Sequence, residues 1–274
     1  MKVSIITINY NNFDGLKKTV ESVLCQTYHE FEYIIVDGAS TDGGAEYVKE
    51  IGKKEYPFVL KWVSEKDTGI YNAMNKGIRM STGDYLLFLN SGDTLVNDQV
   101  LADVFADKTY QSDLLLGRCY VSKNGERIWL SNPTADVTLA TLYYRGIMHQ
   151  ATFIRRTCMI EYGCYDESFR WLADIDFWFR SLIYGKATVE VVDVKVADFD
   201  NSGESSIPKN ERAFIDEADR IFKNEKLHRI YPDYYRFRNQ IGVVNEYEWI
   251  NQHRILRQML KFYHKLLKRI NRHR

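Results

Sequence analysis

Residues 83–93 combine a short apolar run with a carboxylate directly after it. Five apolar residues lead into Asn90, Ser91, Gly92 and Asp93. The end of a buried strand holds a side chain rigidly. A hard cation such as Mg²⁺ or Mn²⁺ prefers oxygen ligands and leaves positions open for phosphate oxygens. We therefore expect Asp93 to bind a divalent metal whose other ligands come from a diphosphate.

Polar residues also follow three earlier apolar segments, which cover residues 3–8, 31–36 and 58–63. They are Asn9, Tyr10 and Asn11 after the first segment, Asp37 and Ser40 after the second, and Asp67 after the third. Ligands of an open parallel sheet bind beyond the carboxyl ends of its strands, so these side chains should gather at one edge and bind a nucleotide. Asp37 can accept a hydrogen bond from a uracil or thymine imide, and Tyr10 can stack on the base. For any single residue, a helix cap or a turn is an equally good explanation.

The loop after the first apolar segment reads Asn9-Tyr10-Asn11-Asn12. It contains neither the G-x-G-x-x-G fingerprint of dinucleotide-binding proteins nor a Walker phosphate loop. A nucleotide bound here therefore belongs neither to a dehydrogenase nor to a P-loop ATPase.

A second group of candidates lies at the start of a predicted helix over residues 171–183. Asp174 and Asp176 point to different faces of such a helix, so they cannot share one role. One can face a cleft as a general base while the other caps the helix or pairs with Arg180. The alternative is that both only stabilise the positive end of the helix dipole.

Two further polar residues, His149 and Gln150, precede a predicted strand over residues 151–154. Together with Asp176 we place them on the acceptor or diphosphate side of the site. A lone histidine is often structural, and that explanation stays open for His149.

Apolar residues at helical spacing separate the four strand-like segments, within residues 16–24, 45–51 and 70–78. Three strand–helix units followed by a strand predict an α/β fold with a doubly wound, mostly parallel sheet. The pattern is looser beyond residue 93. There we expect strands over residues 113–118, 119–122, 151–154 and 189–192, and a hairpin turn at Asn124-Gly125. We divide the chain into a domain of residues 1–204, with halves 1–93 and 94–204, and a helical extension of residues 205–274.

Basic residues are concentrated at the end of the chain. The 274 residues carry no formal net charge, but residues 251–274 hold eight Lys or Arg and no acid, which leaves 29 basic and 37 acidic side chains before them. An amphipathic basic helix within residues 246–274 would contact an anionic membrane surface, pack on the domain or pair two subunits. The acidic body excludes nucleic acid as a partner.

Cysteines and apolar runs indicate the compartment. The four cysteines lack zinc or disulfide spacing, and no apolar run approaches the about 18 residues of a membrane span. We expect a cytoplasmic protein, and contact with the inner face of the cell membrane is one of the alternatives for its basic helix. A homodimer is one possible assembly.

These residues together resemble the family 2 glycosyltransferases, inverting enzymes with the Rossmann-like GT-A fold. The similar segments are residues 3–11, 26–43, 64–77 and 90–93. The resemblance implies that Asp37 and Asp67 contact the base or ribose and that Asp93 holds the metal on the diphosphate. It places the family's late acidic pair on Ala173-Asp174, which makes Asp174 the catalytic base. Two residues depart from the family pattern: Asn90 replaces the first acid of its D-x-D element, and Ala173 replaces a glutamate.

The resemblance implies transfer of a sugar from a nucleotide-sugar, with UDP expected, to the hydroxyl of a saccharide or lipid-linked saccharide. Such a reaction would serve polysaccharide or glycolipid biosynthesis and use Mn²⁺ or Mg²⁺. A nucleotidyltransferase is one alternative, although it requires a glycine-rich loop after the first strand. A non-catalytic carbohydrate- or partner-binding domain of the same fold is another.

Overall fold

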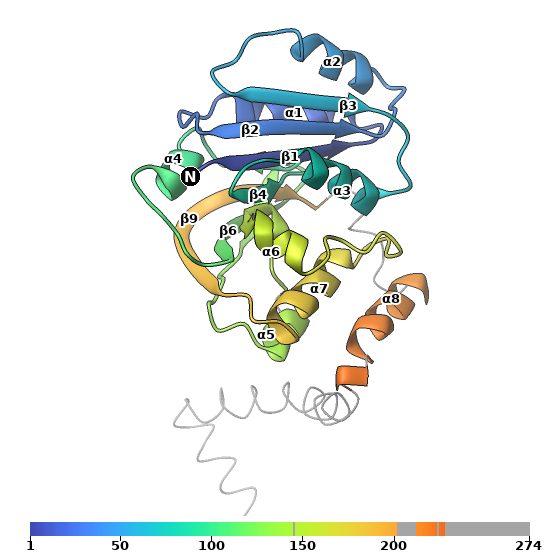
Figure 1. Ribbon diagram of the computed structural model, residues 1–274. Coiled ribbons are helices and arrows are strands. Elements are labelled where there is room, and N and C mark those ends of the chain that lie inside the picture. Colours follow the sequence, from blue (N-terminus) through green and yellow to red (C-terminus); the bar gives the residue numbers. More distant parts are fainter. Residues whose placement is uncertain (145, 202–211, 224, 228–274) are drawn as a thin grey trace, which may run out of the picture. The chain divides into compact units, whose positions relative to one another are not determined.

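The computed structural model describes residues 1–144, 146–201, 212–223 and 225–227 (Figure 1). The chain forms two compact units, Met1–Ala218 and Asp219–Arg274. The boundary expected at residues 204/205 and the basic helix expected within residues 246–274 lie outside the described residues. No helix in the described part has the length and apolar character needed to cross a bilayer.

The first half of the sheet is parallel, as the sequence predicts. The strands β1 (Val3–Asn9), β2 (Phe31–Asp37), β3 (Val59–Ser64) and β4 (Tyr85–Phe88) lie in the order β3-β2-β1-β4. They are linked by the helices α1 (Phe13–Leu24), α2 (Gly44–Ile51) and α3 (Ile70–Met80). The predicted strand–helix order of this half is therefore confirmed.

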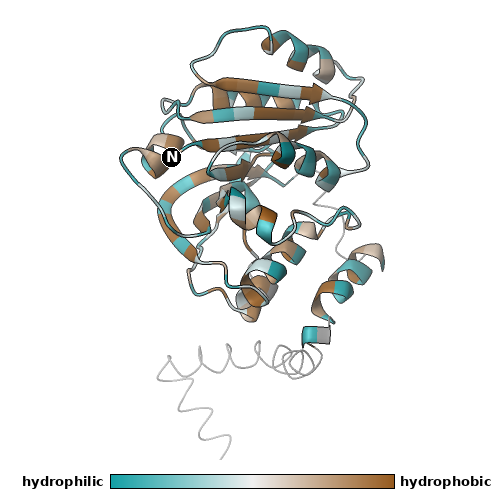
Figure 2. Cartoon of the chain, in the orientation of Figure 1, coloured by the Kyte–Doolittle hydropathy of each residue, from teal (hydrophilic) through white to brown (hydrophobic). Residues whose placement is uncertain are grey.

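Helices cover both faces of this half, which explains why its strands do not alternate between apolar and polar residues. Every residue of β1 and β2 is buried. On one face, α1 packs Leu16 and Val20 into the cluster that contains Ile5. On the other face, Gly77 of α3 lies so close that a Cβ atom there would be 2.4 Å from Ile6 Cγ2. Figure 1 shows α1 behind the strands and α3 in front, and in Figure 2 the strands are largely in the colour of hydrophobic residues.

The second half makes the sheet mixed. Its elements are β5 (Thr94–Leu95), α4 (Val100–Phe105), β6 (Leu114–Lys123), β7 (Glu126–Leu130), α5 (Leu139–Tyr144), the 3-10 helix η1 (His149–Ala151), β8 (Thr152–Arg155), α6 (Arg156–Glu161), α7 (Ala173–Trp178), the π-helix η2 (Phe179–Ile183), β9 (Val189–Asp200), α8 (Arg212–Phe222) and the 3-10 helix η4 (Glu225–Leu227). The sheet continues from β4 through β8, β6 and β9 to β5, and β7 pairs with β6. Among the strand pairs in the described part of this half, only β6–β9 is parallel.

The strands of the second half differ from the sequence prediction. Residues 113–118 and 119–122 form one strand, β6, and β9 extends to Asp200 instead of ending near residue 192. The predicted break between residues 118 and 119 coincides with a shift of the β6–β9 register, which follows another shift between Leu116 and Arg118. A Cβ atom at Gly117 would lie 2.4 Å from Val196 Cγ2, so the close approach of β9 requires glycine there.

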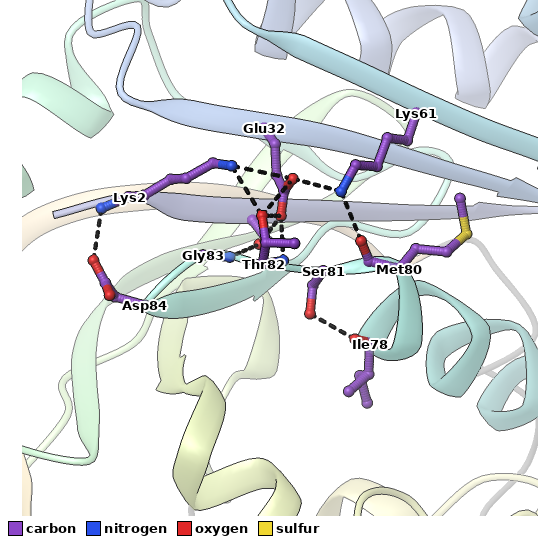
Figure 3. A network of polar contacts seen from close by, with 10 residues as sticks. Lys2, Glu32, Lys61, Ile78, Met80, Ser81, Thr82, Gly83 and Asp84 are labelled. Atoms are coloured by element: carbon purple, nitrogen blue, oxygen red, sulfur yellow. Dashed lines mark hydrogen bonds and ion pairs between the residues drawn. The ribbon is translucent and has the colours of Figure 1, made fainter.

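A buried glutamate joins the strands at the edge opposite the polar strand ends (Figure 3). Glu32 in β2 is fully buried and pairs with Lys61 at 2.9 Å and Lys2 at 3.3 Å. It also accepts hydrogen bonds from Ser4 Oγ at 2.7 Å and from the backbone N–H of Thr82. One carboxylate therefore links β1, β2, β3 and the loop that precedes β4.

We expect Glu32 to make the free energy of unfolding depend on pH in the acidic range. Burial alone would raise the pKa of Glu32, but Lys61, Ser4 and Thr82 outweigh burial and lower it from 4.5 to about 2. A carboxylate whose pKa is lowered by folding stabilises the native state above its unfolded pKa. This contribution should be lost as the pH falls from 4.5 toward 2. Glu32→Gln should reduce the free energy of unfolding at pH 7 by roughly 3 kcal/mol, and by much less at pH 3.

Urea unfolding at both pH values measures this effect, with Glu30→Gln as the control because Glu30 is exposed nearby. An equal loss for Glu32→Gln at both pH values would show that the ionised pair does not provide the stabilisation.

Candidate active site

Three polar side chains lie in a row across the carboxyl ends of the parallel strands. The register pairs Asn9 with Asp37 and Asp37 with Ser64. The buried Asp37 carboxylate accepts hydrogen bonds from Asn9 Nδ2 at 2.8 Å, Ser64 Oγ at 2.7 Å and Ser40 Oγ at 2.6 Å. Its second bond to Ser40, from the backbone N–H, measures 3.0 Å. Asp37 therefore ties the three strand ends to the loop that follows β2.

These bonds bear on the predicted role of Asp37. Burial alone would raise the pKa of Asp37, but the hydrogen bonds from Ser40, Ser64 and Asn9 hold it below its ordinary value. Both carboxylate oxygens accept bonds from within the chain, so a base imide would have to compete with four donors. The contacts favour a supporting role for Asp37 over direct contact with the base.

Tyr10 and Asp67 meet at Gly38, directly after β2. A Cβ atom at Gly38 would lie 2.5 Å from Asp67 Oδ2 and 3.1 Å from Tyr10 Cδ2. The Tyr10 side chain is 67% exposed, so its ring is available for stacking. Asn11, with a φ of 47°, accepts a bond from the backbone N–H of Thr41 at 2.8 Å and so fixes the loop beside Tyr10. An aromatic ring and a carboxylate therefore lie close together beside the Gly38 backbone.

The loop after β4 joins the same edge. Ser91 donates from its backbone N–H to Ile8 O and from Oγ to Asn9 Oδ1, at 3.0 and 2.9 Å. Asn9 thus bridges Asp37 and the loop that carries Asn90 and Asp93. The predicted residues Asn9, Asp37, Ser40 and Ser91 are therefore held in one hydrogen-bond network, and Asn90 directly precedes Ser91 in the chain.

Asp93 is buried and only partly satisfied. Its Oδ1 accepts the backbone N–H of Asp200 at 3.2 Å, whereas its Oδ2 has no partner within the described residues. The same is true of Asn90 Oδ1. Burial raises the pKa of Asp93 to about 7, although His149, the backbone of Asp200 and Gln150 oppose the shift.

Asp93 Oδ2 and Asn90 Oδ1, two buried oxygens without hydrogen-bond partners in the described part, are suitable ligands for a divalent cation. Burying an unpaired carboxylate is unfavourable, and a bound cation would relieve this cost. Among the described residues no group of three or more His, Cys, Asp or Glu side chains could hold a metal. Asp93 and Asn90 can thus contribute to a metal site only if further ligands come from the substrate or water, which is usual for Mg²⁺.

A histidine lies beside the second candidate region. His149 Nδ1 is 3.5 Å from Asp174 Oδ2. His149 Nε2 is buried without a partner in the described part of the chain. On its other side, Asp174 Oδ1 lies 3.4 Å from the hydroxyl oxygen of Tyr71. Asp174, in the first turn of α7, is therefore held between a histidine and a tyrosine.

Asp176 has a different environment from Asp174. It pairs with Arg180 Nε at 2.7 Å, and Arg180 also donates to the backbone carbonyls of Tyr162 and Cys164. These bonds give Asp176 a structural role in fixing α7. Its contacts do not support the predicted place on the acceptor or diphosphate side.

The sequence did not identify Tyr71 or Gly38 as site residues. Tyr71 lies on the apolar side of α3, where a tyrosine is typical of a core face. Its hydroxyl reaches residues 100 and 103 positions away, and no local pattern contains that information. Gly38 follows a predicted strand end, but its role depends on the neighbours that the fold brings to it.

Comparison with known proteins identifies the family. The family model "Glycosyl transferase family 2" matches residues 4–165. The chain belongs to this glycosyltransferase family. An uncharacterised glycosyltransferase of Mycobacterium tuberculosis is 31% identical over 241 residues, which cover 84% of this chain and 85% of that protein. A PGL/p-HBAD biosynthesis glycosyltransferase of Mycobacterium bovis is 32% identical over 206 residues, which cover 73% and 77%.

Solved structures of glycosyltransferases share the fold. S. aureus TarS (residues 1–349), in complex with UDP-GlcNAc, superposes with a TM-score of 0.64 at 22% identity, over 81% of this chain and 66% of that one. The mannosyltransferase PcManGT from Pyrobaculum calidifontis, in complex with GDP-Man and Mn²⁺, gives a TM-score of 0.55 at 16% identity, over 76% and 57%. The predicted GT-A fold is thereby confirmed.

Proposed function

We propose that this glycosyltransferase moves a hexosyl group from a UDP-sugar to an acceptor hydroxyl with inversion at the anomeric carbon. The observation that carries the proposal is the placement of Asp174. Its carboxylate lies between Tyr71 and His149, at 3.4 Å from the Tyr71 hydroxyl oxygen and 3.5 Å from His149 Nδ1. A base and a diphosphate-binding group on opposite sides of one reacting carbon are what an inverting displacement requires.

The donor would lie along the carboxyl edge of β1, β2 and β4. Tyr10 would stack on the base, while Asp67 would accept its imide N–H or a ribose hydroxyl. Complexes of structural neighbours with UDP-GlcNAc, with UDP and with GDP-Man support nucleotide-sugar binding to this fold. We favour UDP because a carboxylate and an aromatic ring suit a uracil base.

Asp93 and Asn90 would hold a divalent cation on the donor diphosphate. When bound, such a cation neutralises charge on the departing phosphate oxygens. Support comes from the orphaned Oδ2 of Asp93 and Oδ1 of Asn90 and from the neighbour complex that contains Mn²⁺.

Asp174 would act as the general base. It takes the proton of the acceptor hydroxyl while the acceptor oxygen attacks the anomeric carbon and the bond to the diphosphate oxygen breaks. Tyr71 and His149 hold the two carboxylate oxygens in place during this step. No covalent intermediate with the protein is formed.

The acceptor would approach from the second half of the domain. A cavity of about 290 Å³ lies there, and its lining includes Met148, directly before His149. Its other apolar lining residues are Leu116, Trp129, Leu130, Pro133, Val137 and Ile147. A cavity of this size and character suits an apolar group of the acceptor. The acceptor would be a saccharide or lipid-linked saccharide in polysaccharide or glycolipid biosynthesis, a role consistent with the PGL/p-HBAD relative.

A lipid-linked acceptor would require the protein to reach a membrane. The basic stretch of residues 246–274 is our proposed contact with the inner face, and it rests on sequence alone. Full-length protein should float with anionic liposomes, whereas a chain that ends at residue 245 should not. Equal flotation of the two chains would contradict this contact.

The donor is tested by thermal unfolding with UDP-, GDP- and dTDP-sugars, with and without Mn²⁺. A UDP-sugar with Mn²⁺ at 100 times its Kd should raise Tm by roughly 5–10 °C, because ligand binding to the native state adds about 2.7 kcal/mol. Tyr10→Ala should remove most of the shift by removing the stacking ring. Ile160→Ala is the matched control, since Ile160 is also exposed but lies on α6. A larger shift with another nucleotide, or no shift with any, would contradict the assignment of the donor.

A further inference from the structure

A carboxylate from α8 binds the loop that leads into the helix of Asp174. Glu217 is 8% exposed and accepts the backbone N–H groups of Arg170, Trp171 and Leu172 at 2.6, 3.0 and 3.2 Å. Leu172 is the N-cap residue of α7, and its side chain forms no capping bond. The start of a helix is stabilised by a hydrogen-bond acceptor for its free N–H groups and by a negative charge. Glu217 supplies both to α7, although it lies about 45 residues later in the sequence.

The bound loop is in contact with the proposed base. The carbonyl oxygen of Trp171 accepts a hydrogen bond from the Tyr71 hydroxyl at 2.7 Å, and that hydroxyl lies 3.4 Å from Asp174 Oδ1. Burial and the adjacent Asp174 charge raise the pKa of Tyr71 well above its ordinary value, so Tyr71 stays a neutral donor. Glu217, Trp171, Tyr71 and Asp174 thus form one continuous series of contacts.

A second contact from the same helix fixes the loop. Phe214 lies one turn before Glu217, and its ring centroid is 6.3 Å from that of Trp171. The guanidinium of Arg170 lies 4.8 Å from the Trp171 ring on the same loop. The first turns of α8 thus fix both the backbone and the ring of Trp171, which carries the carbonyl bonded by Tyr71.

We propose that Glu217 is a positioning residue for the transfer reaction. By fixing residues 170–172, it places the Trp171 carbonyl and the Tyr71 hydroxyl so that they hold the Asp174 carboxylate in line with the acceptor hydroxyl. The proposal rests on the proposed role of Asp174 as base. It extends the catalytic unit into α8, beyond the boundary expected at residue 204. Transfer is sensitive to such positioning, since a shift of about 1 Å in a catalytic group can cost 100-fold in rate.

The test compares Glu217→Gln, Tyr71→Phe and the double variant by kcat, acceptor KM, donor Kd and Tm. Each single variant should lower kcat by about ten- to 100-fold and leave donor Kd unchanged. Because both residues act through Trp171, the double variant should be no slower than the slower single variant. Asp216→Asn is the matched control: Asp216 precedes Glu217, is 53% exposed and pairs with Arg212 on its own helix, so its kcat should not change.

Wild-type kcat in Glu217→Gln would overturn the proposal. Multiplied losses in the double variant would also overturn it, because they would show that the two residues act independently. A loss of kcat matched by an equal loss of donor binding would overturn it too, because it would indicate general destabilisation. If Glu217→Gln does not fold, Tyr71→Phe decides: reduced kcat with intact donor binding supports the series of contacts, and unchanged kcat overturns it. Transfer by Asp174→Asn at the wild-type rate would instead refute Asp174 as the base. Failure of the proposed function can therefore be distinguished from failure of the proposed role of Glu217.

Discussion

Asp174→Asn should lower kcat for sugar transfer by about 10³-fold and leave the Kd of the donor nearly unchanged. The amide keeps the shape of the carboxylate and its contacts with Tyr71, but it cannot take a proton from the acceptor. Loss of a general base typically costs 10²- to 10⁴-fold in rate. The comparison needs initial rates of transfer and a calorimetric titration with the nucleotide-sugar.

Asp176→Asn is the matched control for this substitution. Asp176 lies on the same helix and pairs with Arg180. Its replacement should therefore lower Tm, whereas its effect on kcat should be small. Near-normal transfer by Asp174→Asn would refute the assignment of the base. A loss of kcat in Asp176→Asn as large as that in Asp174→Asn would show that the two residues have not been distinguished.

Asp93→Asn should lower kcat on the order of 100-fold or more and remove the enhancement of donor binding by Mn²⁺. A divalent cation stabilises the departing diphosphate by several kcal/mol, and each 1.36 kcal/mol corresponds to tenfold in rate. Without metal, the variant should be at least as stable as the wild type at pH 8. Burial raises the pKa of Asp93 to about 7, so the protein without metal must hold an unfavourable buried charge at higher pH.

Excess chelator should reduce the wild type to the activity of the variant. Asp84→Asn is the control, because Asp84 is exposed at the opposite end of β4 and bonds the backbone of Lys2. Full wild-type activity in excess chelator would exclude a required metal at Asp93. Unchanged Mn²⁺ dependence in Asp93→Asn would place the metal elsewhere.

The parallel half of the fold could be predicted because its physical signals are local. The residues of β1 and β2 are buried on both faces, so each strand is a mainly apolar segment of the sequence. Polar residues follow these runs directly, and the parallel register brings Asn9, Asp37 and Ser64 into one row. The edge at which we propose that the donor binds was therefore predictable from strand ends alone.

The remaining features depend on contacts between distant parts of the chain. The close approach of β9 to Gly117 is not visible in the sequence, from which we predict two strands divided after residue 118. The bonds from Ser40 and Ser64 that occupy Asp37 arise only when β2 and β3 are paired. Glu217 is separated by 45 to 47 residues from the loop that it binds. No local pattern around Glu217 therefore indicated this contact. Local patterns located the candidate residues and the family resemblance singled out Asp174, whereas the contacts that support the proposed roles required the fold.

The anomeric configuration of the first sugar product tests the central claim most directly. The purified protein with Mn²⁺ and an α-linked UDP-sugar should slowly release sugar to water when no acceptor is present. Proton NMR during the first turnovers should show the β anomer before mutarotation, and Asp174→Asn should release almost none. Initial release of the α anomer would contradict inversion, and no release or transfer from any nucleotide-sugar would contradict the assignment as an active transferase.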